Sequence, residues 1–146
     1  MTYRKAKQDS VRSPDYILKW VRSTFGKYYD PTPYRPKFDL KKHKDALTTE
    51  WKNVNYANIP FSEAKKFVLK GYEQYKKGRT VIMLVKTDVL STLYFSKCPG
   101  AEIKFFMKPV IFPPHQQAPR FNVCLLIWRA GRRSKSYSFF NNTKNT

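Results

Sequence analysis

Two short proline-containing segments carry the polar side chains best placed for chemistry in this sequence. The first is Asp30-Pro31-Thr32-Pro33-Tyr34, and the second is Asn58-Ile59-Pro60-Phe61. Each follows a short stretch that the residue pattern predicts as a strand. Ligands of open α/β sheets bind beyond the carboxyl ends of strands, where Asp offers acceptor oxygens and Asn both a donor and an acceptor. We therefore predict a hydrogen-bonding ligand site at this edge of the sheet.

Both segments also have an ordinary structural interpretation. The second segment alone fits a strand-to-helix turn, in which Phe61 packs against a helix that begins at Ser62. An Asp that precedes a proline, such as Asp30, is a common turn former. The residues around the two segments therefore have to decide between a plain turn and a ligand site.

Metal and disulfide chemistry find little support in the sequence. Cys98 and Cys124 are the only cysteines and His43 and His115 the only histidines, and their spacing is not that of a zinc site. We therefore expect no metal. Cys124 lies in the apolar run 123–127 and is expected to be a buried, inert thiol. So few cysteines favour an intracellular, reducing compartment over a disulfide-rich secreted scaffold.

Composition indicates a folded protein that binds DNA or another polyanion. The 146 residues suffice for one domain, and an aromatic content of 16% excludes a disordered tail protein. Lys and Arg number 29 and Asp and Glu 10, which gives a net charge of +19 at pH 7. We expect neither a signal peptide nor a membrane span. Basic residues near both ends are predicted to contact phosphates: Arg4, Lys5, Lys7, Arg12, Arg129, Arg132, Arg133 and Lys135.

Hydrophobic periodicity predicts the elements that must position the two segments. The sequence Ser13-Pro14-Asp15 is typical of a helix start, with Ser13 as the cap, and Gly26 is placed to end that helix. Residues 54–57 read as a strand, 62–78 as an amphipathic helix and 80–85 as a strand buried on both faces. This order predicts a parallel βαβ unit.

The whole chain therefore predicts an α/β fold with a mostly parallel sheet and helices on its faces. A final strand is expected at residues 121–128. The domain would span residues 13–129, preceded by a basic N-terminal arm at 1–12 and followed by a basic, polar C-terminal tail at 130–146.

In their order, these pieces resemble the DNA N6-adenine methyltransferases of phages and large DNA viruses. An N-terminal helix leads to the Asp30 loop, and Trp51 precedes a strand that ends in an Asn-x-Pro-aromatic motif. A helix begun by Ser, a hydrophobic strand, a Gly-Ala-Glu-Ile stretch at 100–103 and a closing strand that ends in Arg follow. The resemblance covers about residues 13–129 and implies a small Rossmann-like methyltransferase fold that uses S-adenosylmethionine.

The resemblance also implies roles for five residues. Asn58 would hold the adenine amine, and Pro60 would fix the turn. Phe61 would stack on the base, which must be flipped out of the duplex. An Asn oxygen and a neighbouring backbone carbonyl can accept both N–H groups of the amine and stabilise the charge that develops during transfer. Asp30 and Pro31 would lie beside the cofactor.

Four residues depart from the family pattern. Ile59 replaces a proline of the second segment, Thr32 and Arg35 replace Cys and Asn in the first loop, and Lys86 stands where the family often has proline. Three functions therefore stay open. The chain is an active DNA adenine methyltransferase, a catalytically silent relative with a structural role in a large assembly, or a non-catalytic nucleic-acid-binding module. The structural role would make it a minor capsid or virion component, located in the virus particle.

Overall fold

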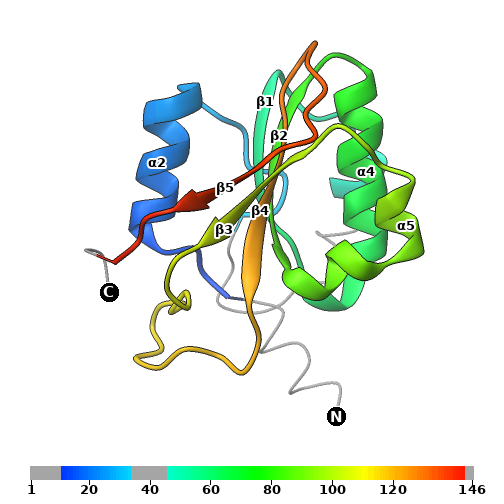
Figure 1. Ribbon diagram of the computed structural model, residues 1–146. Helices are drawn as coiled ribbons and strands as arrows, with labels where there is room; N and C mark the ends of the chain where they lie inside the picture. Colours follow the sequence, from blue (N-terminus) through cyan, green and yellow to red (C-terminus); the bar gives the residue numbers. More distant parts are fainter. Residues whose placement is uncertain (1–10, 34–45, 144–146) are drawn as a thin grey trace.

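A five-stranded sheet with helices on both faces forms the body of the protein (Figure 1). The computed structural model describes residues 11–33 and 46–143. The strand order is β1 (Val54–Asn58), β2 (Thr80–Lys86), β4 (Val123–Trp128), β3 (Glu102–Phe106) and β5 (Tyr137–Phe140). Helix α2 (Asp15–Phe25) covers one face, and α4 (Ala64–Lys76) with the short α5 (Leu93–Ser96) covers the other. Two 3-10 turns, Phe61–Glu63 and Thr87–Ser91, follow β1 and β2.

The predicted βαβ unit is confirmed: β1 and β2 pair in parallel and α4 connects them. The expectation of a mostly parallel sheet is also confirmed, because β1, β2, β3 and β5 run in one direction and β4, which lies between β2 and β3, is the one antiparallel strand of the described sheet. The connection from residue 107 to 122 brings the chain back beside β3 in the opposite direction. Helices cover both faces, so β4 is buried throughout and its apolar run does not reveal its direction.

The two faces of the sheet bury separate clusters of apolar side chains. Ile17 and Val21 of α2 pack on one face with Tyr56. Phe67 and Val68 of α4 pack on the other. Gly71 allows this close packing, since a Cβ there would lie 2.7 Å from the Met83 Cε atom and 3.3 Å from Val81 Cγ1. Cys124 is buried and free, as expected, and burial raises the pKa of its thiol to about 12.

The helix ends differ partly from the prediction. Gly26 ends α2 with a φ of 83°, which confirms the predicted stop. Ser13 does not cap the helix, because its hydroxyl instead hydrogen bonds to the Tyr56 hydroxyl at 2.7 Å. This buried contact attaches the start of α2 to the middle of β1. Ser62 lies inside the 3-10 turn that precedes α4.

The segment predicted as a tail contributes a strand to the sheet. Tyr137–Phe140 pairs with β3, and the ring of Phe140 lies 5.5 Å from that of Trp20 on α2. The buried Asn142 then accepts from the Lys108 amide at 2.8 Å and donates to the Lys108 carbonyl at 3.0 Å. The domain therefore extends past the predicted boundary at residue 129. Many Lys, Arg, Ser and Asn residues around this strand hide its alternation in the sequence.

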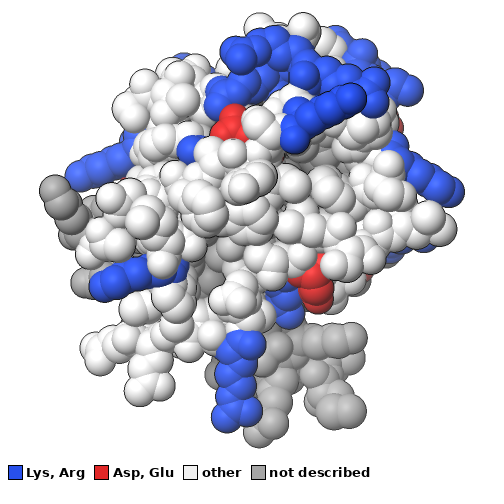
Figure 2. Space-filling model, viewed as in Figure 1, with Lys and Arg blue, Asp and Glu red and all other residues white. Residues whose placement is uncertain are grey.

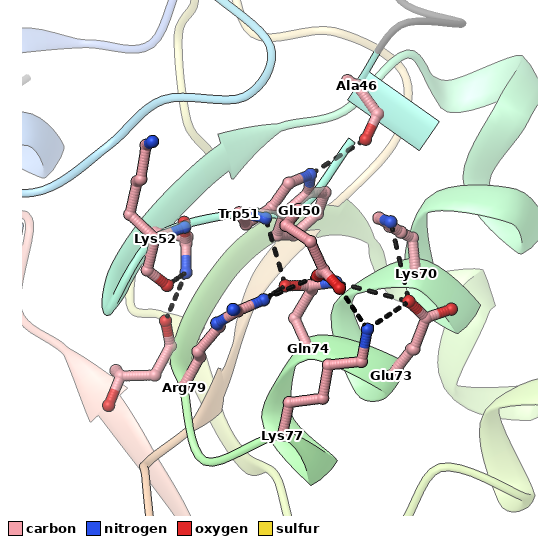
Figure 3. A network of polar contacts seen from close by, with 11 residues as sticks. Ala46, Glu50, Trp51, Lys52, Lys70, Glu73, Gln74, Lys77 and Arg79 are labelled. Carbon is pink, nitrogen blue, oxygen red and sulfur yellow. Dashed lines mark hydrogen bonds and ion pairs between the residues drawn. The ribbon is translucent and has the colours of Figure 1, made fainter. Parts of the chain in front are cut away.

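The segment before β1 is fixed to α4 by the buried amide of Gln74 (Figure 3). Gln74 Oε1 accepts from the Trp51 backbone N–H at 3.1 Å and from Arg79, and Nε2 donates to Glu50 Oε2 at 2.8 Å. Hydrogen bonds from Lys77, Gln74 and Arg79 lower the pKa of Glu50 to about 2. This network sets where β1, and therefore Asn58 at its end, lies against α4.

Replacing Gln74 by leucine is expected to lower the free energy of unfolding by about 1–3 kcal/mol. The change leaves the Trp51 amide without its partner in a buried position, and an unsatisfied buried donor costs about that much. Urea unfolding followed by tryptophan fluorescence measures the effect. The matched control is Gln116→Leu, the same substitution at an exposed position, which should change the midpoint little. Equal effects of both substitutions would contradict the structural role of Gln74.

Candidate functional site

The two predicted segments meet at the carboxyl ends of the strands, at the lower edge of the sheet in Figure 1. Tyr29 bridges to Asn55 in parallel, which places the Asp30 loop beside the end of β1. The Thr32 amide donates to Asp30 Oδ1 at 2.8 Å, and the Thr32 hydroxyl lies 3.3 Å from both Asp30 Oδ1 and the Asn58 carbonyl oxygen. Thr32 therefore ties the loop that carries Asp30 and Pro31 to the loop that carries Asn58.

Asn58 presents an acceptor to which no described residue donates. Its Nδ2 donates to the Val11 carbonyl at 2.8 Å, so the amide is held in one orientation. Its Oδ1 is buried and has no hydrogen-bond partner among the described residues. An unsatisfied buried acceptor costs about 1–3 kcal/mol of stability, a cost that a donor from a bound molecule would remove. Oδ1 is available to accept an N–H from a bound molecule.

The carboxyl of Asp30 has an unusual environment. Burial raises its pKa to about 6, although the backbone and side-chain hydrogen bonds from Thr32 oppose the shift. Both of these bonds end on Oδ1. The half-buried carboxylate is therefore ready to take up a cation or a hydrogen-bond donor, because either would favour its charged form.

Phe61 belongs to a cluster of two aromatic rings and one ammonium group. Its ring meets that of Phe121 edge to face at 5.1 Å. Lys86 Nζ lies 5.2 Å from the centre of the Phe61 ring and 4.5 Å from that of Phe121, at distances typical of cation–π contacts. Pro60 is buried at the turn before Phe61. The ring predicted to stack on a base therefore touches a lysine at the end of β2.

Sequence reasoning did not identify Lys86 and Phe121 as site residues. Lys86 ends a buried strand at the same edge as Asn58, which pairs in register with Leu84. The rule that singled out Asp30 and Asn58, a polar residue at a strand's carboxyl end, would also have found Lys86. Phe121 gives no such signal, because it comes to the site only through the antiparallel return of the chain.

A cavity of about 610 Å³ opens beside this cluster. Its walls include Val11, Lys86, His115, Arg120 and the rings of Phe112 and Phe121. Cationic and aromatic groups together suit a planar ligand that carries negative charge. No group of three or more His, Cys, Asp or Glu side chains able to hold a metal lies in the described ranges.

The predicted basic residues do not gather at this site. Arg129, Arg132 and Arg133 line a small hollow with Glu102, and Ala130 N donates to Thr80 Oγ1 at 3.0 Å. Thr80 begins β2, so this hollow lies a full strand away from Lys86, about 20 Å. Lys and Arg gather at that upper end of the molecule in Figure 2. These arginines lie there because β4 is antiparallel to β2. The carboxyl end of β4, which Arg129 follows, therefore lies beside the amino end of β2.

The predicted basic residues differ in their surroundings. Arg12 is exposed and pairs with Asp15 at 3.3 Å on the surface. Lys135 is exposed in the turn before β5. Arg129 donates to Glu102 at 2.9 Å, and its guanidinium lies 4.9 Å from the centre of the Phe25 ring. Arg4, Lys5 and Lys7 lie outside the described residues.

Comparison with known proteins shows the family. A family profile described as DNA N-6-adenine-methyltransferase (Dam) matches residues 1–117. The chain belongs to this family. The part that matches the Dam family contains Asp30, Asn58, Phe61 and Lys86, whereas β4, the Arg129 turn and β5 lie beyond it. The predicted family and the α/β fold with flanking helices are therefore confirmed.

The chain is also similar to a protein of known structure. A predicted O-methyltransferase, protein Atu636 from Agrobacterium tumefaciens, is similar at 15% sequence identity and a TM-score of 0.39. The likeness covers 69% of this chain and 47% of that one, so the Dam-family chain spans about half the length of that protein. No curated protein matches the chain. In the part of the chain that the structure describes, no helix has the length and apolarity to cross a membrane.

Proposed function

We propose that this chain transfers a methyl group from S-adenosylmethionine to the exocyclic N6 amine of adenine in DNA. Membership of the Dam family supports the reaction class. The observation that carries the proposal is the buried Oδ1 of Asn58, which accepts no hydrogen bond from the described residues and is held in place by the Nδ2 bond to Val11. An acceptor in a fixed position is what recognition of an amine requires.

The chemistry assigned to Asn58 follows from the adenine amine itself. The nitrogen lone pair is delocalised into the ring, so the amine is a poor nucleophile. Asn58 Oδ1 accepts one N–H and holds the nitrogen toward the methyl donor, and it stabilises the positive charge that develops on the nitrogen. The Ile59 backbone carbonyl would accept the second N–H. Pro60 fixes the turn, and Phe61 with Phe121 supplies an apolar wall for the flipped base.

The residues around Asp30 fit the cofactor. S-adenosylmethionine supplies a methyl group on a sulfonium centre and carries hydroxyl and ammonium groups that donate hydrogen bonds. The half-buried Asp30 carboxyl accepts such donors, and Thr32 holds it next to the Asn58 loop. Asp30 and Pro31 would therefore bind the cofactor, while Asn58 binds the base.

A direct assay tests the proposal. Purified chain is incubated with S-adenosylmethionine and unmethylated DNA, the DNA is digested to deoxynucleosides, and N6-methyldeoxyadenosine is quantified by mass spectrometry. Formation of N6-methyldeoxyadenosine above a heat-denatured control is expected. A folded chain that binds neither cofactor nor DNA and forms no methylated base would contradict the proposal.

A catalytically silent, structural role is the second candidate, and one observation favours it. The Lys86 ammonium lies over the Phe61 ring. This is the ring on which the target base would stack according to the family resemblance. In that case the basic surface would hold the chain to a polyanion within a larger assembly, such as a virus particle. Cofactor binding separates the two candidates, because a silent relative has no need of the Asp30 carboxyl.

For the enzyme, we propose that Lys86 pairs with a DNA phosphate when the base enters. Lys86→Gln is then expected to lower the slope of log affinity for duplex DNA against log salt by about 1, as for the loss of one phosphate contact. Fluorescence anisotropy at several salt concentrations measures the slope. Lys19→Gln, an exposed lysine on α2, serves as the control. Equal slopes for the Lys86 variant and the unaltered chain would remove Lys86 from the DNA interface.

A further inference from the structure

An aromatic surface on the last strand has no place in the proposed reaction. The rings of Phe105, Tyr137 and Phe139 form an aromatic ladder across β3 and β5, with centres 6.2 Å apart for Phe105–Tyr137, 5.8 Å for Phe105–Phe139 and 6.0 Å for Tyr137–Phe139. Tyr137 is 67% and Phe139 59% exposed. Because these rings are in contact with one another, they form a continuous exposed apolar patch, and such patches mark interaction sites.

The opposite face of the same strands shows the contrast. Phe140 there packs against Tyr16 and Trp20 of α2, with ring centres 5.7 and 5.5 Å apart. Figure 1 shows α2 beside β5 on that side, whereas α4 and α5 lie toward β2. The aromatic ladder is on the face that carries α4 and α5, where Phe105 packs only at the margin of the core. Core packing therefore explains Phe140 but not Tyr137 and Phe139.

Positive charge borders the aromatic ladder. The turn that leads into β5 carries the exposed residues Arg132, Arg133 and Lys135, and Lys135 is two residues, about 7 Å, from Tyr137. The Ser134 amide donates to the Gly100 carbonyl at 3.0 Å, and the Tyr75 hydroxyl donates to the Arg132 carbonyl, so the turn is held to the domain. In Figure 2 the Lys and Arg side chains gather at the upper end, above a mostly uncharged central area.

We propose that the aromatic ladder binds single-stranded nucleic acid. Bases stack on Tyr137 and Phe139, and phosphates pair with Arg132, Arg133 and Lys135. Paired bases inside a duplex cannot offer their faces to these rings, so the surface selects unpaired strands. A net charge of +19 favours a polyanion over an apolar protein partner.

This site goes beyond the proposed methyl transfer. The strands β5 and β1 lie at opposite edges of the sheet, four strand spacings or about 19 Å apart. The aromatic ladder therefore does not overlap the Asn58 site, and its binding can be measured without cofactor or turnover. Loss of methylation and loss of strand binding are separate results.

The experiment compares two double variants of the full chain. Tyr137→Leu with Phe139→Leu keeps an apolar surface but removes the rings, whereas Tyr137→Phe with Phe139→Tyr keeps both rings. Anisotropy with a labelled 20-mer of thymidine should show affinity reduced by about tenfold or more for the leucine pair and by less than about twofold for the ring-preserving pair. Affinity for a 20-base-pair duplex should change less than about twofold in both.

A second measurement uses the unaltered chain. Photocrosslinking to a strand that contains 5-iodouracil should label the tryptic peptide 136–144, which carries both exposed rings. Crosslinks only at other peptides would overturn the proposal, as would a leucine pair that binds the single strand like the unaltered chain. Light scattering gives one further outcome that overturns it. A dimer that the leucine pair dissociates, with strand affinity unchanged, would assign the aromatic ladder to a second copy of the chain.

Discussion

Replacing Asn58 by alanine is expected to lower the rate of adenine methylation by about 10²–10³-fold or more. Removal of one preorganised group that stabilises developing charge typically has an effect of this size. The Oδ1 atom makes no hydrogen bond with the described residues, so removing it breaks no hydrogen bond to them. The single bond that is lost is the one from Nδ2 to Val11, and its contribution to stability is about 1 kcal/mol.

Three readouts make this result specific. The rate should fall, whereas the melting temperature and the affinity for S-adenosylmethionine should stay close to those of the unaltered chain. Asn53→Ala is the matched control, because Asn53 is an exposed asparagine just before the same strand. A methylation rate that survives Asn58→Ala, or a rate that falls equally with Asn53→Ala, would mean that the amine is held by other groups.

Replacing Asp30 by asparagine is expected to stabilise the protein at pH 8 and to weaken cofactor binding. Burial raises the pKa of Asp30 to about 6, above its ordinary value of 3.8. The folded state therefore binds more protons than the unfolded state between about pH 4 and pH 6, so this group lowers stability as pH rises through that range. The shift of about 2 units corresponds to roughly 3 kcal/mol, lost in full above pH 6.

The asparagine variant removes that charge but keeps an oxygen that can accept from Thr32. Its melting temperature should exceed that of the unaltered chain at pH 8 and match it near pH 4. Calorimetric titration should show affinity for S-adenosylmethionine reduced by about tenfold or more, since hydrogen bonds to charged groups contribute about 1.5–3 kcal/mol. In the unaltered chain that affinity should rise with pH through about 6 and then level off.

Asp88→Asn is the control, because Asp88 is an exposed carboxyl beyond the end of β2. A carboxylate whose charge stabilises the fold would give the opposite result. Removing its charge would lower the stability at pH 8. An Asp30→Asn variant that is less stable at pH 8 and binds the cofactor normally would show that Asp30 only shapes the turn.

The structure also changes how DNA binding should be tested. Deleting residues 130–146 would remove β5 and the buried Asn142, so weaker binding could reflect a damaged sheet. Point substitutions in the turn avoid this difficulty. Arg132→Gln with Arg133→Gln should lower the salt slope for single strands by about 1.4, or 0.7 for each contact, without changing the melting temperature.

Some features of this protein follow from local sequence alone. The apolar run of β2, the spacing in α4 and the glycine that ends α2 are each decided by side-chain burial and backbone preference within a few residues. The family pattern then linked Asp30, Pro31, Asn58, Pro60 and Phe61, and the fold brings the two loops together through Thr32. Asn58, Pro60 and Phe61 belong to the parallel βαβ unit, and the parallel bridge from Tyr29 to Asn55 brings Asp30 and Pro31 to the same edge of the sheet.

Other features required the tertiary structure, because they depend on the direction of strands far apart in the sequence. Antiparallel β4 brings Phe121 to the site and moves Arg129, Arg132 and Arg133 to the opposite end. The pairing of β5 with β3 turns a predicted tail into a strand and exposes Tyr137 and Phe139. An apolar run indicates that a strand is buried on both faces. It does not indicate the direction of the strand or the neighbour with which it pairs.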